Sequence, residues 1–284
     1  MTAKQSKRIL AIHDLSGFGH TSLMAVIPIM YRLGIRICAL PTALLSANTD
    51  YPDPCWVDLS PQLEPFSRHW QELGLRFDAI SSGFLSSAEQ AAQVKEVILR
   101  LQHENTTVLV DPVMGDNGSL YGCFDAGIVD AMLELVSLAD VVTPNFTEAA
   151  LLAGADPKSS PGASDILAWC RKISASGPRH VIITSVPGSK AGSLEVQYYE
   201  AGATDLVRYP FATESGAHPG AGDCFSAFVL AGIVNGYGIR KAIQAAVEIM
   251  TKAISLGISQ GSDWREGIPL EQVLQWDLPK YYHK

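Results

Sequence analysis

Strand-like and helix-like segments alternate along most of the chain, and this alternation restricts the fold more than any other feature. Short aliphatic and β-branched runs predict strands at 8–13, 35–40, 77–81, 107–111, 140–143 and 180–184. Helical spacing of apolar residues predicts helices at 22–33, 89–101, 129–138, 148–153 and 165–176. Repeated strand–helix units of this kind predict an α/β fold with a mainly parallel sheet and helices on both faces.

The pattern changes in the last third of the chain. Residues 194–200 and 205–209 flank the turn-like stretch Ala201–Thr204, which predicts an antiparallel hairpin added to the sheet. Two helices are then expected, at 222–235 and 239–258. Nothing in the 284 residues reads as a linker, and a composition of 47% hydrophobic and 18% charged residues is typical of a sheet buried on both faces. We therefore expect one domain, 1–284, built as a three-layer α/β/α sandwich.

Charge and cysteine content exclude several classes of protein. A net charge of −8 disfavours binding to nucleic acid or to an anionic membrane, both of which need clustered Lys and Arg. The five cysteines are scattered, odd in number and without a C-x-x-C pair, so neither a disulfide framework nor a zinc site is predicted. The first residues contain no apolar signal segment, and no apolar run approaches the length of a membrane span. These features predict a cytoplasmic protein.

Polar residues follow four of the predicted parallel strands. These strand ends are His13-Asp14, Asp111, Thr143-Pro144-Asn145 and Thr184-Ser185. In open α/β sheets, ligands bind outside the carboxyl ends of the strands. The sequence therefore predicts a functional site along that edge of the sheet.

The loop Gly220-Ala221-Gly222-Asp223 precedes a long apolar helix. Its glycines allow a tight turn and leave room for a ligand to approach the backbone. The first N–H groups of a helix lack intrahelical partners and, with the helix dipole, form an anion site. A carboxylate at that position could accept a proton from an attacking hydroxyl. The plainer alternative is a loop with an acidic residue capping a helix.

Three further segments contain motifs that, together with this loop, resemble a known family. Asp111–Asp116 reads DPVMGD, residues 143–148 read TPNFTE, and residues 8–20 together with 45–51 form a third segment. With GAGD, these motifs occur in the order found in the ribokinase-like superfamily, and they most closely resemble its pyridoxal kinases. The resemblance covers nearly the whole chain. It implies a ribokinase-like sandwich that transfers a phosphoryl group from ATP.

The resemblance assigns roles to residues of the phosphate side. Asp223 would be the base for the substrate hydroxymethyl group, and Gly220, Ala221 and Gly222 would form the anion hole. Asn145 and Glu148 would organise Mg²⁺ and the phosphates, largely through water, because Mg²⁺ keeps several of its waters. By themselves, Asn145 and Glu148 also fit an N-cap with an acidic first turn.

A monovalent cation is also implied. Asp111, Thr143 and Thr184 correspond to residues around a potassium-type site, although Asp111 alone could equally be a turn residue before proline. Asp116 would lie near the nucleotide phosphates. Tyr121 resembles a lid tyrosine near those phosphates, with an ordinary surface tyrosine as the alternative.

The substrate side departs from the family pattern. Thr49 resembles a threonine near the pyridoxal ring. Asp14 stands where many pyridoxal kinases have a serine near the ring nitrogen, and Ser22-Leu23 replaces a common Gly-Asn pair. An Asp could pair with a protonated ring nitrogen or select another heterocycle.

The resemblance implies ATP-dependent phosphorylation of the 5′-hydroxymethyl group of pyridoxal, pyridoxamine or pyridoxine, by an enzyme whose relatives are often homodimers. Two alternatives stay open. Hydroxymethylpyrimidine kinases share the fold but usually carry Cys where Asp223 stands. The second alternative is a non-catalytic protein with a kinase fold that binds vitamin B6 or a nucleotide, since fold alone does not fix function.

Overall fold

The computed structural model describes residues 6–125, 127–188, 192–211 and 218–283, and its elements follow the predicted alternation. The strands are β1 (Arg8–Ser16), β2 (Arg36–Leu45), β3 (Trp56–Asp58), β4 (Ala79–Ser82), β5 (Thr107–Val110), β6 (Gly115–Asp116), β7 (Ser119–Leu120), β8 (Val141–Val142), β9 (His180–Pro187), β10 (Leu194–Glu200) and β11 (Val207–Phe211). The helices are α1 (Ser22–Arg32), α2 (Ser60–Glu72), α3 (Ala88–Leu101), α4 (Gly127–Val136), α5 (Phe146–Leu152), α6 (Ala163–Ala175), α7 (Ala221–Val234), α8 (Ile239–Gln260), the 3₁₀ helix η1 (Trp264–Glu266), α9 (Leu270–Val273) and α10 (Pro279–Tyr282).

One sheet organises the molecule, with strand order β11-β10-β9-β8-β5-β4-β1-β2-β3. The six strands from β9 to β2 pair in parallel, while β3 pairs antiparallel with β2 at one edge. At the other edge, β10 and β11 form the predicted antiparallel hairpin, and β10 pairs antiparallel with β9. The expected mainly parallel sheet with an added hairpin is therefore confirmed.

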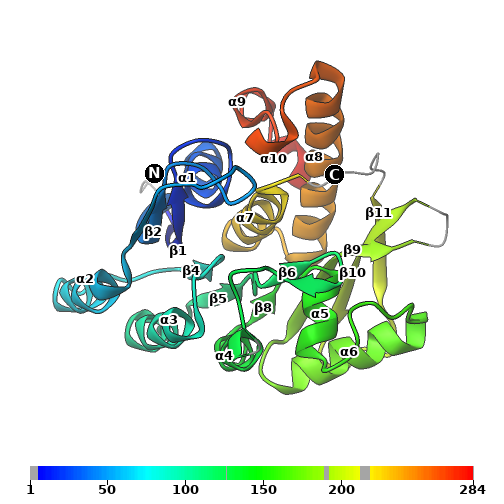
Figure 1. Cartoon of the computed structure of the whole chain (residues 1–284), viewed down its shortest axis with the longest axis horizontal. Coiled ribbons are helices and arrows are strands. Elements are labelled where there is room, and N and C mark those ends of the chain that lie inside the picture. Colours follow the sequence, from blue (N-terminus) through cyan, green and yellow to red (C-terminus); the bar gives the residue numbers. More distant parts are fainter. Residues whose placement is uncertain (1–5, 126, 189–191, 212–217, 284) are drawn as a thin grey trace.

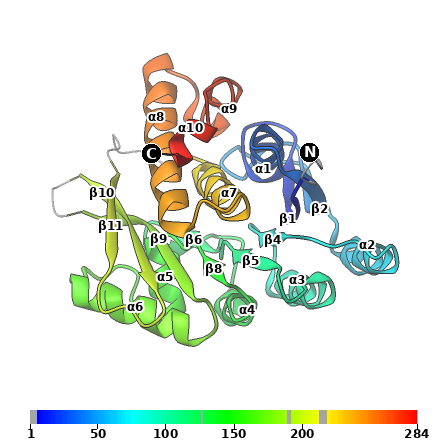
Figure 2. The same ribbon diagram turned by 180° about the vertical axis from the view of Figure 1, so that it is seen from behind.

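Helices cover both faces of this sheet, which confirms the predicted three layers (Figures 1 and 2). Along β1, Ile9 and Ala11 point into a core shared with α1, α7 and α8, whereas Leu10 and Ile12 point into a second core shared with helices α2 to α6. Successive residues of a strand face opposite sides, so a run that is apolar at every position requires a cover on each side.

The chain reverses its direction of travel across the sheet beside β1. From β1 it moves to β2 on one side, then returns to β4 on the other side and continues to β5, β8 and β9. The gap between the carboxyl ends of β1 and β4 is therefore a topological switch point, where ligands of open α/β sheets bind.

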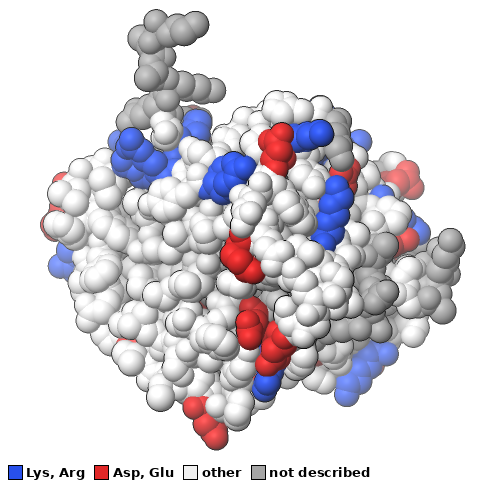
Figure 3. Space-filling view, turned by 90° about the horizontal axis from the view of Figure 1, so that it is seen from above, with Lys and Arg blue, Asp and Glu red and all other residues white. Residues whose placement is uncertain are grey.

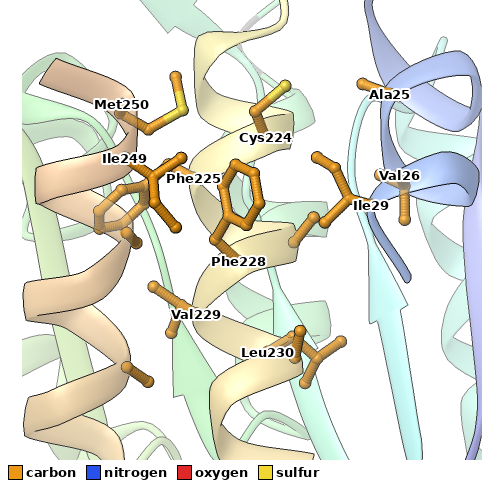
Figure 4. Close-up of a cluster of buried hydrophobic side chains, with 14 of the residues drawn as sticks. Ala25, Val26, Ile29, Cys224, Phe225, Phe228, Val229, Leu230, Ile249 and Met250 are labelled. Carbon is orange, nitrogen blue, oxygen red and sulfur yellow. The ribbon is translucent and has the colours of Figure 1, made fainter. Parts of the chain in front are cut away.

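Helix α7 brings the GAGD loop to this region. Its apolar residues pack between two other helices, with Ile249 and Met250 of α8 on one side and Ala25, Val26 and Ile29 of α1 on the other (Figure 4). The nine consecutive residues from Cys224 to Gly232 are all buried, so the helix is held from all sides. A helix buried in this way gives its N-terminus a fixed position.

Several elements were not predicted. They are the short edge strand β3, the polar helix α2, the two-residue strands β6 and β7 that form a separate hairpin, and the segments after α8. Helix α2 buries only Leu63 and Ser67, so its sequence has no strong apolar stripe to reveal it. The hairpin β6–β7 begins in the last two residues of the DPVMGD segment and turns just after it, at Asn117 and Gly118, both with positive φ.

Figure 3 shows one face that is mostly uncharged, with Asp and Glu groups running down its middle and Lys and Arg mainly toward its upper part. Among the described residues, no helix combines the length and apolar character that crossing a bilayer requires. The five cysteines all lie in the described ranges and are free thiols.

Candidate active site

The GAGD loop forms the N-terminus of α7 in a conformation that demands glycine. Gly220 is the N-cap with φ +74°, in the left-handed region, and a Cβ there would lie 2.2 Å from the carbonyl oxygen of His20. The Ala221 N–H donates to His218 O, and the Cys224 N–H makes the first helical bond, to Gly220 O. The N–H groups of Gly222 and Asp223 lie in the helix's first turn, where N–H groups have no partner within the helix.

The Asp223 carboxylate is held by the start of α1. Its Oδ2 accepts the Ser22 backbone N–H at 2.7 Å, and its Oδ1 lies 3.7 Å from His13 Nδ1. The side chain is 13% exposed, so it is mostly removed from water but still reachable. This geometry agrees with the predicted position of a base at an anion site, and the catalytic role itself stays a prediction.

Asp14 lies beside Asp223 and shares Ser22 with it. Its Oδ1 accepts the Ser22 Oγ–H at 2.5 Å, and its Oδ2 accepts the Ser16 Oγ–H at 3.2 Å. Burial raises the pKa of Asp14 to about 6; the serine hydrogen bonds oppose this rise and the Asp223 charge adds to it. A carboxyl whose pKa lies near neutrality can change its charge state when a charged ligand arrives.

The second departure from the family pattern, Ser22, has an unusual backbone conformation. Its φ is +49°, a left-handed conformation that glycine adopts freely and serine rarely does. Relatives with glycine here would take this conformation without strain. In this chain Ser22 adopts the left-handed conformation, and its side chain donates a hydrogen bond to Asp14. The two departures, at 14 and 22, are therefore in direct contact.

Asp111 directly follows β5, one residue beyond the end of the strand, and it belongs to a buried polar cluster. Its Oδ2 accepts the Ser226 Oγ–H at 2.9 Å, and Ser226 Oγ also lies 2.9 Å from Thr143 Oγ1. Burial and the charge of Asp223 raise the pKa of Asp111 to about 7. Ser226 was not among the predicted site residues; the available signal was its place on α7, one helical turn after Asp223.

Asn145 and Glu148 form the capping box that their spacing suggested. The Asn145 side chain accepts the Glu148 N–H at 2.9 Å, while Glu148 Oε2 accepts the Asn145 N–H at 2.8 Å. Glu148 also accepts the Met114 N–H, and Asn145 Nδ2 donates to Gly115 O. The pKa of Glu148 is well above its ordinary value because of burial and the nearby Asp111. The pair thus ties α5 to the DPVMGD segment.

Thr184 lies next to Asn145. The two residues form a parallel backbone bridge, and the Thr184 N–H donates to Pro144 O at 2.9 Å. No hydrogen bond between Thr184 and Asp111 or Thr143 is present in the described part of the chain. Ser226 is instead the hydroxyl that joins Asp111 to Thr143.

Asp116 and Tyr121 belong to the small hairpin and the residues that follow it. Asp116 is exposed, and its carboxylate accepts the Asn117 N–H at 2.7 Å. The Tyr121 ring is 39% exposed, and burial together with the carboxylates of Glu148 and Asp116 raises the pKa of its hydroxyl. Tyr121 therefore lies near acidic side chains, and its place beside the nucleotide phosphates stays a prediction.

Thr49 is exposed and lines a cavity of about 440 Å³. Its other lining residues are Trp56, Asp58, Phe84, Ser86 and Cys123. Phe84 packs edge-to-face on Trp56 at 6.3 Å and follows Gly83, the residue that contacts His13. The cavity thus opens beside the switch point, with aromatic walls suited to a flat ring.

The donor set fits loosely held cations. Among the described residues, no group of three or more His, Cys, Asp or Glu is arranged to hold a metal ion. Both Glu148 oxygens are occupied by backbone N–H groups, so Glu148 suits contact through water rather than direct ligation. Asp111, buried with hydroxyl oxygens around it, has the oxygen chemistry that a monovalent cation prefers.

Comparison with known proteins identifies the family. The family model described as phosphomethylpyrimidine kinase matches residues 71–266. The chain belongs to this kinase family. It is 30% identical over 266 residues to the pyridoxal kinase PdxY of Paraburkholderia xenovorans, covering 87% of this chain and 88% of that protein.

Solved structures of this kinase family agree with the fold. A Bacteroides thetaiotaomicron protein described as a phosphomethylpyrimidine kinase, crystallised with pyridoxal, is 35% identical and superposes with a TM-score of 0.92 over 97% of this chain and 96% of its own. The pyridoxal kinase of Lactobacillus plantarum is 31% identical, with a TM-score of 0.88 over 98% and 99% of the two chains. The predicted resemblance to pyridoxal kinases is confirmed.

Proposed function

We propose that this chain is a pyridoxal kinase, which transfers the γ-phosphoryl group of ATP to the 5′-hydroxymethyl group of pyridoxal, pyridoxamine or pyridoxine. The observation that carries the proposal is the position of Asp223 at the first turn of α7, beside the switch point of the sheet. Similarity to the pyridoxal kinases, including a relative crystallised with pyridoxal, supports this substrate class over a hydroxymethylpyrimidine.

In the proposed reaction, Asp223 accepts the proton of the hydroxymethyl group as its oxygen attacks the γ-phosphorus in line. The first-turn N–H groups of α7, which follow Gly220 and Ala221, stabilise negative charge on the transferring group. The Ser22 N–H fixes Asp223 Oδ2, so the carboxylate does not rotate away. Tyr121 and Asp116 cover the nucleotide phosphates from the hairpin side.

On the substrate side, we infer that Asp14 pairs with the protonated ring nitrogen and that Thr49 lies along the ring. The raised pKa of Asp14 reflects burial without a cationic partner, and a pyridinium N–H would supply one. The aromatic walls of the adjacent cavity suit the face of a pyridine ring. A neutral sugar would leave Asp14 unpaired, which disfavours ribose.

Two cations complete the proposal. Mg²⁺ would be held near Asn145 and Glu148 through water, where it would neutralise charge on the phosphates. A potassium-type ion would lie by Asp111 and Thr143, with Thr184 at the end of the neighbouring strand and Ser226 as an added oxygen.

The finer expectations about assembly and location also stay proposals. Exposed apolar side chains on α1 and at the β2–β3 edge, namely Met24, Tyr31, Leu44 and Val57, offer surface for the expected homodimer. The free thiols fit a reducing, cytoplasmic compartment. Two cores on one continuous sheet support one domain over 1–284.

The test is ATP turnover with a panel of pyridoxal, pyridoxamine, pyridoxine, hydroxymethylpyrimidine and ribose. We expect turnover with at least one B6 vitamer, and we expect Asp223→Asn to lower kcat by about 100-fold or more while substrate binding stays near normal. Binding without turnover in the wild-type chain would support the non-catalytic alternative. Turnover with hydroxymethylpyrimidine alone would replace the substrate assignment, and near-normal kcat in Asp223→Asn would remove the base.

A further inference from the structure

His13 is a buried imidazole at the switch point that the proposed mechanism does not use. It lies near the carboxyl end of β1, is 3% exposed, and places Nδ1 3.7 Å from Asp223 Oδ1. Within the described residues, that nitrogen has no hydrogen-bond partner. Buried polar atoms are nearly always paired, and exceptions are often found where a function completes the pairing.

Gly83 fixes the place of this ring. It follows β4 and lies so close to His13 that a Cβ at Gly83 would be 2.0 Å from Cε1 and 2.2 Å from Nδ1. The imidazole thus lies directly against the backbone that leaves β4, in the gap between the two strands of the switch point. Since Gly83 has an unexceptional φ, the need for glycine here comes from the ring and not from the turn.

The surroundings of Asp223 make this neighbour significant. Its Oδ2 is held by the Ser22 N–H, which leaves Oδ1 facing the imidazole. Two further carboxyl groups near it, Asp14 and Asp111, have their pKa raised in part by the Asp223 charge. Burial lowers the pKa of His13, with the Asp223 charge opposing this effect, so the ring is a neutral group that can carry its proton on Nδ1.

We propose that His13 is a positioning residue for the base, and that its Nδ1–H donates to Asp223 Oδ1 when substrate closes the site. The inference rests on the proposed role of Asp223. The present separation exceeds a hydrogen bond by about 0.7 Å, and catalytic hydrogen bonds commonly tighten only in the substrate complex. With both oxygens held by N–H groups, the carboxylate keeps one orientation toward the substrate hydroxyl.

The experiment compares His13→Leu with His13→Asn. Leucine fills the space of the imidazole but donates nothing, whereas the Asn side-chain amide can place an N–H where Nδ1 stands. We expect His13→Leu to lower kcat by about 10- to 100-fold with KM changed less than about threefold, which is the range for a hydrogen bond to a charged group. We expect His13→Asn to recover most of that loss. A packing role predicts the opposite order, because Asn leaves the larger void.

Two controls separate this inference from the function on which it rests. Thermal unfolding of each variant checks that it is folded, and Asp223→Asn checks the base. In the Asp223→Asn background, His13→Leu should lower the residual rate by less than about twofold, because the carboxylate through which it acts is gone. If wild type turns over no vitamer, or Asp223→Asn is fully active, the proposed function fails. Suppose instead that the wild type turns over a vitamer and Asp223→Asn is impaired. The His13 inference alone is then overturned if His13→Leu is as active as wild type, or if His13→Leu lowers the rate by the same factor with Asp223 and with Asn at 223.

Gly83→Ala provides a second route that leaves His13 in the chain. The added Cβ would displace the imidazole, so we expect kcat to fall with KM nearly unchanged, as in His13→Leu. In a His13→Ala background the same change meets no ring and should have little further effect on kcat. Equal losses of kcat from Gly83→Ala in both backgrounds would contradict the role of the ring.

Discussion

Replacing Asp14 with Asn should stabilise the ligand-free protein, and should do so more at high pH than at low pH. Asp14 is 4% exposed, and burial raises its pKa from the ordinary 3.8 to about 6. An acid whose pKa is raised on folding holds its proton more tightly in the folded state. Ionising it therefore costs stability, and the cost is absent below pH about 4 and complete above pH about 6.

The magnitude follows from the two pKa values. A difference of about 2 pKa units is about 3 kcal/mol at pH 8, where the carboxyl is ionised in both states. At pH 5 the folded carboxyl is still largely protonated, and the cost is about 1.6 kcal/mol. Asn does not ionise, so the variant carries no such cost at any pH. The hydrogen bonds that Asn at position 14 makes to Ser16 and Ser22 also change the free energy of unfolding, by an amount that does not vary with pH. The advantage of Asp14→Asn should thus grow by about 1.4 kcal/mol from pH 5 to pH 8.

The assay is urea unfolding of both proteins at pH 5 and pH 8, without B6 vitamers or nucleotide, followed by far-UV circular dichroism. Asp78→Asn is the matched control. Asp78 pairs with Lys7 at 2.7 Å and accepts the Arg8 N–H, so its pKa is lowered and it is ionised in both states at both pH values. Its replacement should destabilise by about the same amount at pH 5 and pH 8. An Asp14→Asn effect that is constant with pH, or larger at pH 5, would refute the reasoning.

Two further changes test the loop and the cation site. Gly220→Ala should destabilise the protein by clearly more than Gly236→Ala. Both glycines have positive φ, so alanine costs about 1 kcal/mol or more in backbone strain at either position, but only at Gly220 does the added Cβ meet backbone, 2.2 Å from His20 O. Equal shifts in the thermal unfolding midpoint would show that the contact with His20 does not matter. If Asp111, Thr143 and Thr184 surround a monovalent cation, the kinase rate should be higher in potassium than in a bulky organic cation at equal ionic strength, and equal rates would count against that site.

Local signals in the sequence were enough for the parallel strands of the sheet and the added hairpin. Continuous apolar strands with polar ends predicted both the parallel sheet and the edge where Asp14, Asp111 and Asp223 gather. The hairpin β10–β11 was also found from its turn-like stretch, although β11 begins two residues later than expected, at Val207. These features depend on periodicity and turn chemistry, which neighbouring residues determine.

The pairings within the site could not be read in the same way. Ser226 joins Asp111 to Thr143 across 115 and 83 residues of sequence, and His13 meets Asp223 only because β1 and α7 border the same gap. Contacts of this kind depend on the tertiary packing of helices and strands, and a serine inside an apolar helix gives no local sign of its partner. The small hairpin β6–β7 was missed because two-residue strands show no periodicity.

The two departures from the family pattern are best understood as one change. Asp14 in place of serine puts a carboxyl group beside Asp223, where the two charges repel each other and hydrogen bonds offset part of that cost. Ser22 in place of glycine adds a hydroxyl that donates to Asp14, while its backbone N–H donates to Asp223. Its backbone is left-handed, with φ +49°. Glycine at 22 would keep the bond to Asp223 and lose the one to Asp14, so a chain with Asp at 14 has reason to accept the backbone strain of serine.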